Sequence, residues 1–138
     1  MATIIEQLAT ALQSSGIVMG LEHHAQAILA KLATSGGRTQ MVKVSLEQRK
    51  QGSEYLVRLT SRACKAEHHS IIKEALKTNS LSEVGSLSLY TAGSTSVIDV
   101  RHSLVAEGLQ FDEFVSALRT VAFHADAIEQ RMGGGDKF

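Results

Sequence analysis

The sequence predicts a two-layer α+β domain in which helices cover one face of an antiparallel sheet made of two β-hairpins. Hydrophobic residues recur at helical spacing near both ends of the chain and alternate with polar residues in the middle. Each alternating segment keeps one polar face, whereas a sheet buried on both sides would show continuous apolar runs. The length of 138 residues fits one domain. We expect a helical segment over 1–37, an α+β core over 38–132 and a flexible tail over 133–138.

The N-terminal segment is predicted to hold two helices. Thr3 and Glu6 have the spacing of a capping box, in which each side chain satisfies a free backbone amide of the first turn. Hydrophobic residues follow at helical spacing until Gly16. A second helical pattern covers residues 21–32, and glycines at 36–37 are expected to end it.

Four segments in the middle of the chain alternate apolar and polar residues, as half-buried strands do. In chain order these segments are 42–46, 55–62, 86–90 and 98–101. They are expected to pair as two antiparallel hairpins, the first turning at residues 50–53. A short helix is predicted between the hairpins over 67–78. Asn79 is expected to end it, because asparagine tolerates the left-handed conformation of a helix C-terminus.

The last helix has the clearest pattern. Hydrophobic residues between Phe111 and Met132 form one stripe over several helical turns. Asp112 and Glu113 lie in the first turn, where carboxylates interact favourably with the helix dipole. Three glycines from residue 133 onward are expected to end the helix.

Composition bounds the function. Fourteen basic side chains balance fourteen acidic ones, so the basic excess of most nucleic-acid-binding proteins is absent and nucleic acid is a disfavoured partner. The single cysteine, Cys64, excludes an internal disulfide and fits a reducing compartment. The first residues lack the basic run of a secretory signal, and no apolar stretch approaches the roughly 20 residues of a membrane span. We therefore expect a cytoplasmic protein without a membrane partner.

The histidines do not form a recognisable metal site. Two adjacent pairs, at 23–24 and 68–69, fall on predicted helices, where neighbouring side chains point about 100° apart. A helical metal site needs ligands at positions i and i+4. His102 and His124 are isolated, and His124 is expected at the boundary of the apolar stripe of the last helix. No metal or cofactor is predicted.

Cys64 is the other candidate for chemistry. Arg62 and Lys65 lie near it in sequence, and cations can lower the pKa of a thiol. No histidine is placed to activate it, so a structural cysteine is the favoured interpretation. Phosphate-loop, dinucleotide and nucleophile-elbow motifs are also absent. We expect a chain that is not an enzyme and has no catalytic residues.

One cluster of charged and aromatic residues is predicted on the outer face of the sheet. Its members are Lys43, Arg58, Arg62, Tyr90 and Arg101. Glu47 and Asp99 fall on the same face and dilute its positive charge. The cluster is either a solvated sheet face or a surface that binds a partner or an anionic ligand.

The second half of the chain resembles the YbjN-like proteins and the class I type III secretion chaperones. The resemblance covers the strand Leu56 to Arg62, a helix ending in Leu76-Lys77-Thr78-Asn79, the hairpin over 85–100 and the long helix carrying Ala125-Asp126. It implies a bacterial, homodimeric, non-catalytic protein that binds extended protein segments or a protein partner. Two departures from the family pattern are the second predicted helix over 21–32 and the neutral charge, where secretion chaperones tend to be acidic.

The function favoured by the sequence is therefore protein binding, as a chaperone-like protein or regulatory adaptor. The alternative is binding of an anionic ligand or nucleic acid through Arg58, Arg62 and Arg101. An enzyme that uses Cys64 or the histidine pairs is the third hypothesis.

Overall fold

The computed structural model describes residues 3–24, 26–49, 52, 54–66, 69–79 and 85–132. In chain order the elements are α1 (Ile4–Ser15), β1 (Gly20–His24), β2 (Ala27–Ala33), β3 (Thr39–Gln48), β4 (Tyr55–Lys65), α2 (His69–Asn79), β5 (Ser86–Ala92), β6 (Thr95–Val105) and α3 (Phe111–Met132). The predicted turn over 50–53, the first two residues of the predicted helix over 67–78 and the tail over 133–138 lie largely or wholly outside the described residues.

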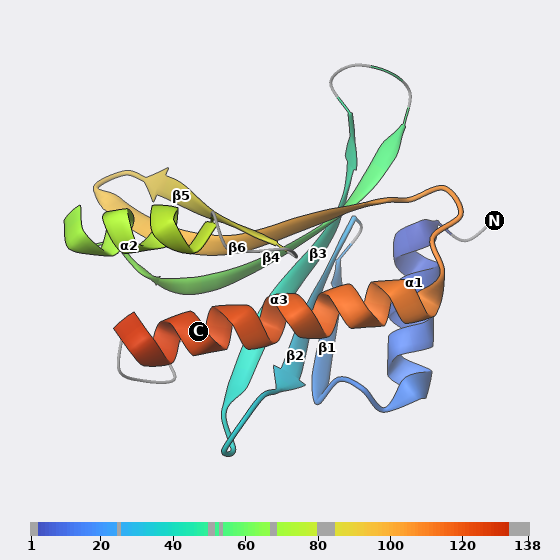
Figure 1. The fold of residues 1–138 in the computed structure, drawn as a ribbon. Coiled ribbons are helices and arrows are strands. Elements are labelled where there is room, and N and C mark those ends of the chain that lie inside the picture. Colours follow the sequence, from blue (N-terminus) through green and yellow to red (C-terminus); the bar gives the residue numbers. More distant parts are fainter. Residues whose placement is uncertain are drawn as a thin grey trace.

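The strands form one antiparallel sheet with the order β1-β2-β3-β4-β6-β5 (Figure 1). Both predicted hairpins are confirmed, as β3–β4 and β5–β6. They join through β6, which lies between β4 and β5. The last strand of the chain, β6, therefore pairs with β4 of the hairpin β3–β4, and residues from β4 and β6 become neighbours.

The predicted helix over residues 21–32 is wrong, because this segment forms the hairpin β1–β2. Ile28, Ala30 and Leu32 are buried, whereas the neighbouring Lys31 is exposed, which is the two-residue alternation of a strand. The apolar residues of this segment fit either period locally. Pairing of β2 with β3 decides between them, since it satisfies the backbone amides of β2 and buries one of its faces.

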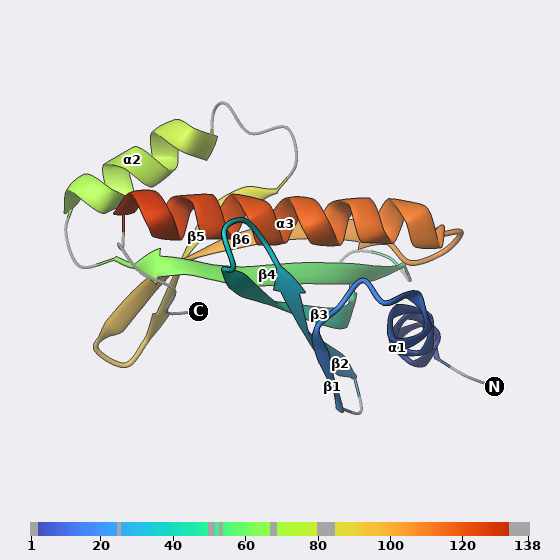
Figure 2. The ribbon, with the colours of Figure 1, turned by 90° about the horizontal axis from the view of Figure 1, so that it is seen from below.

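The predicted one-sided packing is confirmed. Helix α3 lies along one face of the sheet against β3, β4 and β6, while α1 contacts β1 to β3 and α2 contacts β5 (Figure 2). Phe114, Leu118 and Val121 of α3 are fully buried in one apolar core with the inward residues of the strands. The other face, which we call the open face, is not covered by any described helix. Its polar side chains were predicted from the alternation of the strands.

The two helix ends predicted from capping residues have different outcomes. The capping box of α1 is confirmed, since the Glu6 amide donates to Thr3 Oγ1 and the Thr3 amide donates to Glu6 Oε2. Helix α2 ends at Asn79 as predicted, but among the described residues only glycines have positive φ, so the left-handed conformation is not the reason. Instead, the Asn79 side chain donates to the Leu87 carbonyl and accepts from the Leu87 amide, which ties α2 to β5.

Candidate functional site: the open face of the sheet

All five residues predicted as a partner-binding cluster lie together on the open face. They line one shallow hollow of about 260 Å³ over β3 to β6, with Glu47 and Asp99 among its other lining residues. The strand register explains why these residues lie together, because Lys43 pairs with Thr60 and Thr60 pairs with Arg101. Directly paired residues present their side chains on the same face of a sheet. The prediction that the two carboxylates share this face is also confirmed.

Ion pairs neutralise two of the open-face arginines. Arg58 Nη1 lies 2.9 Å from Glu47 Oε2, and Arg62 Nε lies 3.5 Å from Asp99 Oδ1. Asp99 is only 4% exposed, although it lies on the open face. Among the described residues, Lys43 and Arg101 make no ion pair on this face. The face therefore keeps a positive excess after its internal pairs are formed.

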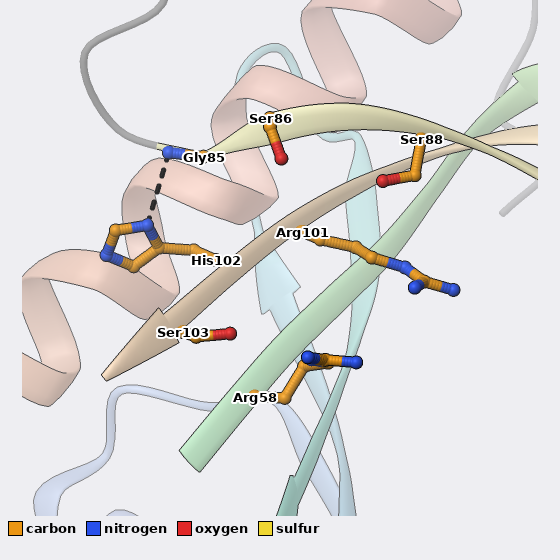
Figure 3. A pocket seen from close by; sticks show the side chains of 7 residues that line it. All are labelled: Arg58, Gly85, Ser86, Ser88, Arg101, His102 and Ser103. Atoms are coloured by element: carbon orange, nitrogen blue, oxygen red, sulfur yellow. Dashed lines mark hydrogen bonds between the residues drawn. The ribbon is translucent and has the colours of Figure 1, made fainter. Parts of the chain in front are cut away.

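A second hollow, of about 410 Å³, adjoins the first at the junction of β4, β5 and β6. Arg58 and Arg101 line it together with the hydroxyls of Ser86, Ser88 and Ser103 (Figure 3). The serines were missed by the sequence reasoning. The alternation of serine with leucine along β5 placed Ser86 and Ser88 on the polar face, but only the β5–β6 pairing brings Ser86 opposite Arg101.

The residues at the start of β5 form one edge of this hollow. Gly85 has φ +80°, a conformation that L side chains rarely adopt, and a Cβ there would lie 3.2 Å from Val100 Cγ1. Its amide donates to His102 Nδ1 at 3.2 Å. The ring of His102 points away from the two arginines in Figure 3, so it supports the backbone at the edge of the hollow rather than the hollow's open side.

The covered face holds a second charged cluster, which the sequence reasoning missed. Arg38, in the turn between β2 and β3, donates from Nε to Asp126 Oδ1 at 2.8 Å and from Nη2 to Glu129 Oε1 at 2.9 Å. Both acidic side chains are buried in α3, and the Arg38 side chain is 17% exposed. A signal was present, because Asp126 and Glu129 interrupt the apolar stripe of the last helix. The cluster fastens the β2–β3 turn to α3.

Cys64 is buried in β4. Burial raises the pKa of its thiol, and the nearby Glu129 carboxylate raises it further. The thiolate form that a nucleophile requires is therefore disfavoured, despite the neighbouring Arg62 and Lys65. This environment favours the predicted structural cysteine over a reactive one.

The histidines are spread over the molecule. His23 and His24 are exposed on the edge strand β1 instead of a helix, and His24 Nε2 lies 3.6 Å from Glu22 Oε2. His68 lies outside the described residues, and His69 begins α2. His124 is half-buried in α3, where burial and the charge of Arg131 lower its pKa. Within the described ranges, no three His, Cys, Asp or Glu side chains are grouped so as to hold a metal ion.

No helix in the described part of the chain is both long and apolar enough to cross a membrane. The sequence matches no model of a known protein family, and its comparison with curated proteins also finds no match.

Proposed function

We propose that the chain is a non-catalytic protein-binding module, a chaperone-like protein or regulatory adaptor, that binds an extended segment of its partner on the open face. The observation that carries the proposal is the convergence of the five predicted residues on a sheet face that the described helices leave uncovered. Arginine and tyrosine are enriched in protein interfaces, because each combines a large contact area with hydrogen-bonding groups. Tyr90 is 45% exposed, so its ring is available for such contacts.

The order of helix and strand at the start of the chain supports the resemblance to YbjN-like proteins and class I secretion chaperones. That family places a strand soon after its first helix, and β1 follows α1 after four residues, 16–19. Because residues 21–32 do not form a helix, the second predicted helix is no longer a departure from the family pattern. The neutral net charge remains a departure, and it favours the broader YbjN-like group over the secretion chaperones.

The proposal is tested by placing a photo-crosslinking amino acid at one of two matched threonines. Thr60 lies on the open face between Arg58 and Arg62, whereas Thr120 is exposed on α3, on the opposite side of the sheet. In cells that express the chain naturally, the Thr60 variant is expected to form a discrete protein adduct and the Thr120 variant is not. Adducts of equal yield from both positions, or none from Thr60, would contradict binding at the open face.

A second candidate function is binding of an anionic ligand or nucleic acid by Arg58, Arg62 and Arg101. The observation in its favour is that three arginines share one face with Lys43 and leave a positive excess. This candidate predicts binding to oligonucleotides that weakens steeply with salt and is lost when Arg58 and Arg62 are replaced by alanine. Salt-independent binding, or binding retained by that variant, would exclude it.

The proposal also includes a homodimer and a cytoplasmic location. The homodimer follows from the resemblance, and the cytoplasmic location is supported by the single buried cysteine, which fits a reducing compartment. Sedimentation of the purified chain at micromolar concentration tests the first, and fractionation of the native cells tests the second. A monomer at that concentration would remove the dimer from the proposal.

A further inference from the structure

The hollow at the junction of β4, β5 and β6 combines two arginines with three hydroxyl groups. Arg58 is paired with Ser103 across β4 and β6, and Arg101 is paired with Ser86 across β6 and β5. Figure 3 shows these side chains with Ser88 around the same open hollow. Guanidinium and hydroxyl groups all donate hydrogen bonds, and no acidic residue lines this hollow among the described residues. The lining is therefore suited to an anion.

Arg101 has no hydrogen-bond acceptor for its Nε atom among the described residues. Its Nε atom is buried without a hydrogen-bond partner, and the described residues give it no ion pair. Arg58, by contrast, already has Glu47 at 2.9 Å. Arg101 also lines the open hollow, and none of the described residues forms an ion pair with its guanidinium. Its Nη groups can therefore donate to a partner supplied from outside.

The charge balance indicates which anion the hollow accepts. Arg58 and Arg101 bring two positive charges, and Glu47 cancels one of them. One unbalanced charge matches a carboxylate, whose two oxygens accept the paired hydrogen bonds of a guanidinium. A nucleic acid would bring a phosphate with each nucleotide, and the phosphates beyond the hollow would meet Glu47 and Asp99 beside Lys43 and Arg62.

We infer that this hollow binds the carboxylate of an aspartate or glutamate side chain in an extended segment of the protein partner, with Arg101 as the main contact. The inference depends on the proposed function, since it names the chemistry of the segment that the open face recognises. Extended chains present every second side chain on one face. A segment with acidic residues at alternate positions can therefore place one carboxylate in the hollow while its other side chains contact the rest of the open face.

The test uses two capped hexapeptides, Ac-(Glu-Thr)3-NH2 and Ac-(Gln-Thr)3-NH2, titrated into the full chain while the NMR signals of the arginine Nε–H groups are followed. The glutamate peptide is expected to shift the Arg101 signal, and the glutamine peptide is not. Arg101→Gln is expected to weaken binding at least about tenfold, as loss of a hydrogen-bonded charge does. Arg101→Lys should restore it in part, because lysine keeps the charge without the planar fork.

Arg119→Gln is the matched control, since Arg119 is exposed on α3, on the far side of the sheet, and its loss changes the net charge equally. It is expected to bind the glutamate peptide like the wild-type chain. Thermal unfolding of both variants checks that they remain folded. Equal affinity of Arg101→Gln and the wild type, equal binding of the two peptides, or no binding of the glutamate peptide would each overturn the inference.

Further measurements distinguish a failure of the carboxylate assignment from a failure of the proposed function. Inorganic phosphate or an oligothymidylate that shifts Arg101 when the glutamate peptide does not would overturn the carboxylate assignment and favour the second candidate function. If the Thr60 crosslink to a protein survives in the Arg101→Gln variant at full yield, the protein-binding function stands and the assignment of the hollow fails. If no crosslink forms and the glutamate peptide does not bind, both fail.

Discussion

The two faces of the sheet use arginine in opposite ways. On the covered face, Arg38 donates to Asp126 and Glu129, whose side chains are 3% and 1% exposed. On the open face, Arg58 and Arg62 have partners that α3 does not cover, and Arg101 has no ion-pair partner among the described residues. The first arrangement ties the β2–β3 turn to α3 through a charge, whereas the second leaves the charge of Arg101 without an ion pair among the described residues.

The comparison indicates that the burial of an ion pair affects its contribution to stability more than the distance between its partners does. Arg38–Asp126 and Arg58–Glu47 have nearly the same separation, 2.8 Å and 2.9 Å. Removing one partner of a buried pair leaves the other charge without solvent, whereas an exposed partner is rehydrated. We therefore expect the same substitution to have very different effects on the two faces.

Arg38→Met tests this comparison with the largest expected effect. It should lower the free energy of unfolding by about 3–5 kcal/mol, because Asp126 and Glu129 would remain buried without their cation. Urea denaturation followed by circular dichroism measures the change. Arg49→Met is the control, since its pair with Glu54 is half exposed and should be worth about 0–1 kcal/mol. Equal losses in the two variants would refute the contrast.

Arg58→Met makes the same substitution, arginine to methionine, on the open face. We expect a loss of about 0–1 kcal/mol, because Glu47 is 43% exposed and regains water when the pair is broken. The same urea experiment measures it. A loss above about 2 kcal/mol would mean that this face stabilises the fold as the covered face does.

Arg101→Met extends the comparison to an open-face arginine that makes no ion pair among the described residues. The change in unfolding free energy should stay within about 0.5 kcal/mol, because Arg101 makes no ion pair in the described structure and its buried Nε lacks an acceptor. A modest gain in stability would agree with the removal of an unsatisfied polar atom. A large loss would show that Arg101 stabilises the fold, contrary to its proposed binding role.

The smallest expected effect is a pH dependence from His124 on the covered side. Burial and Arg131 lower its pKa in the folded state, so the unfolded state binds the proton more readily below the ordinary pKa of 6.5. Stability should therefore fall as the pH drops from 7 through 6.5 toward the folded-state pKa. His124→Gln should remove this part of the pH slope in urea titrations between pH 5 and 7. An unchanged slope would contradict the assignment to His124.

The sheet could be predicted where alternation and turn residues agreed. Residues 42–46 and 98–101 each show one apolar face and one polar face, and this local pattern also placed Arg58, Arg101 and Tyr90 outward. The segment over 21–32 was mistaken for a helix because Ile28, Leu29 and Leu32 fit a helical spacing as well as Ile28, Ala30 and Leu32 fit a strand. Local periodicity cannot decide such a case.

The sequence by itself determined which side of each correctly predicted strand is apolar, since the two-residue period of a strand is a local property. Only the tertiary structure decided which charges meet. Arg38 contacts Asp126 and Glu129 at separations of 88 and 91 residues, and Arg58 lies opposite Ser103 only because β6 pairs with β4 as well as with β5. Contacts between residues this far apart depend on strand order and packing, which no local pattern records. They separate Arg38, which joins the β2–β3 turn to α3, from Arg101, which has no ion pair among the described residues.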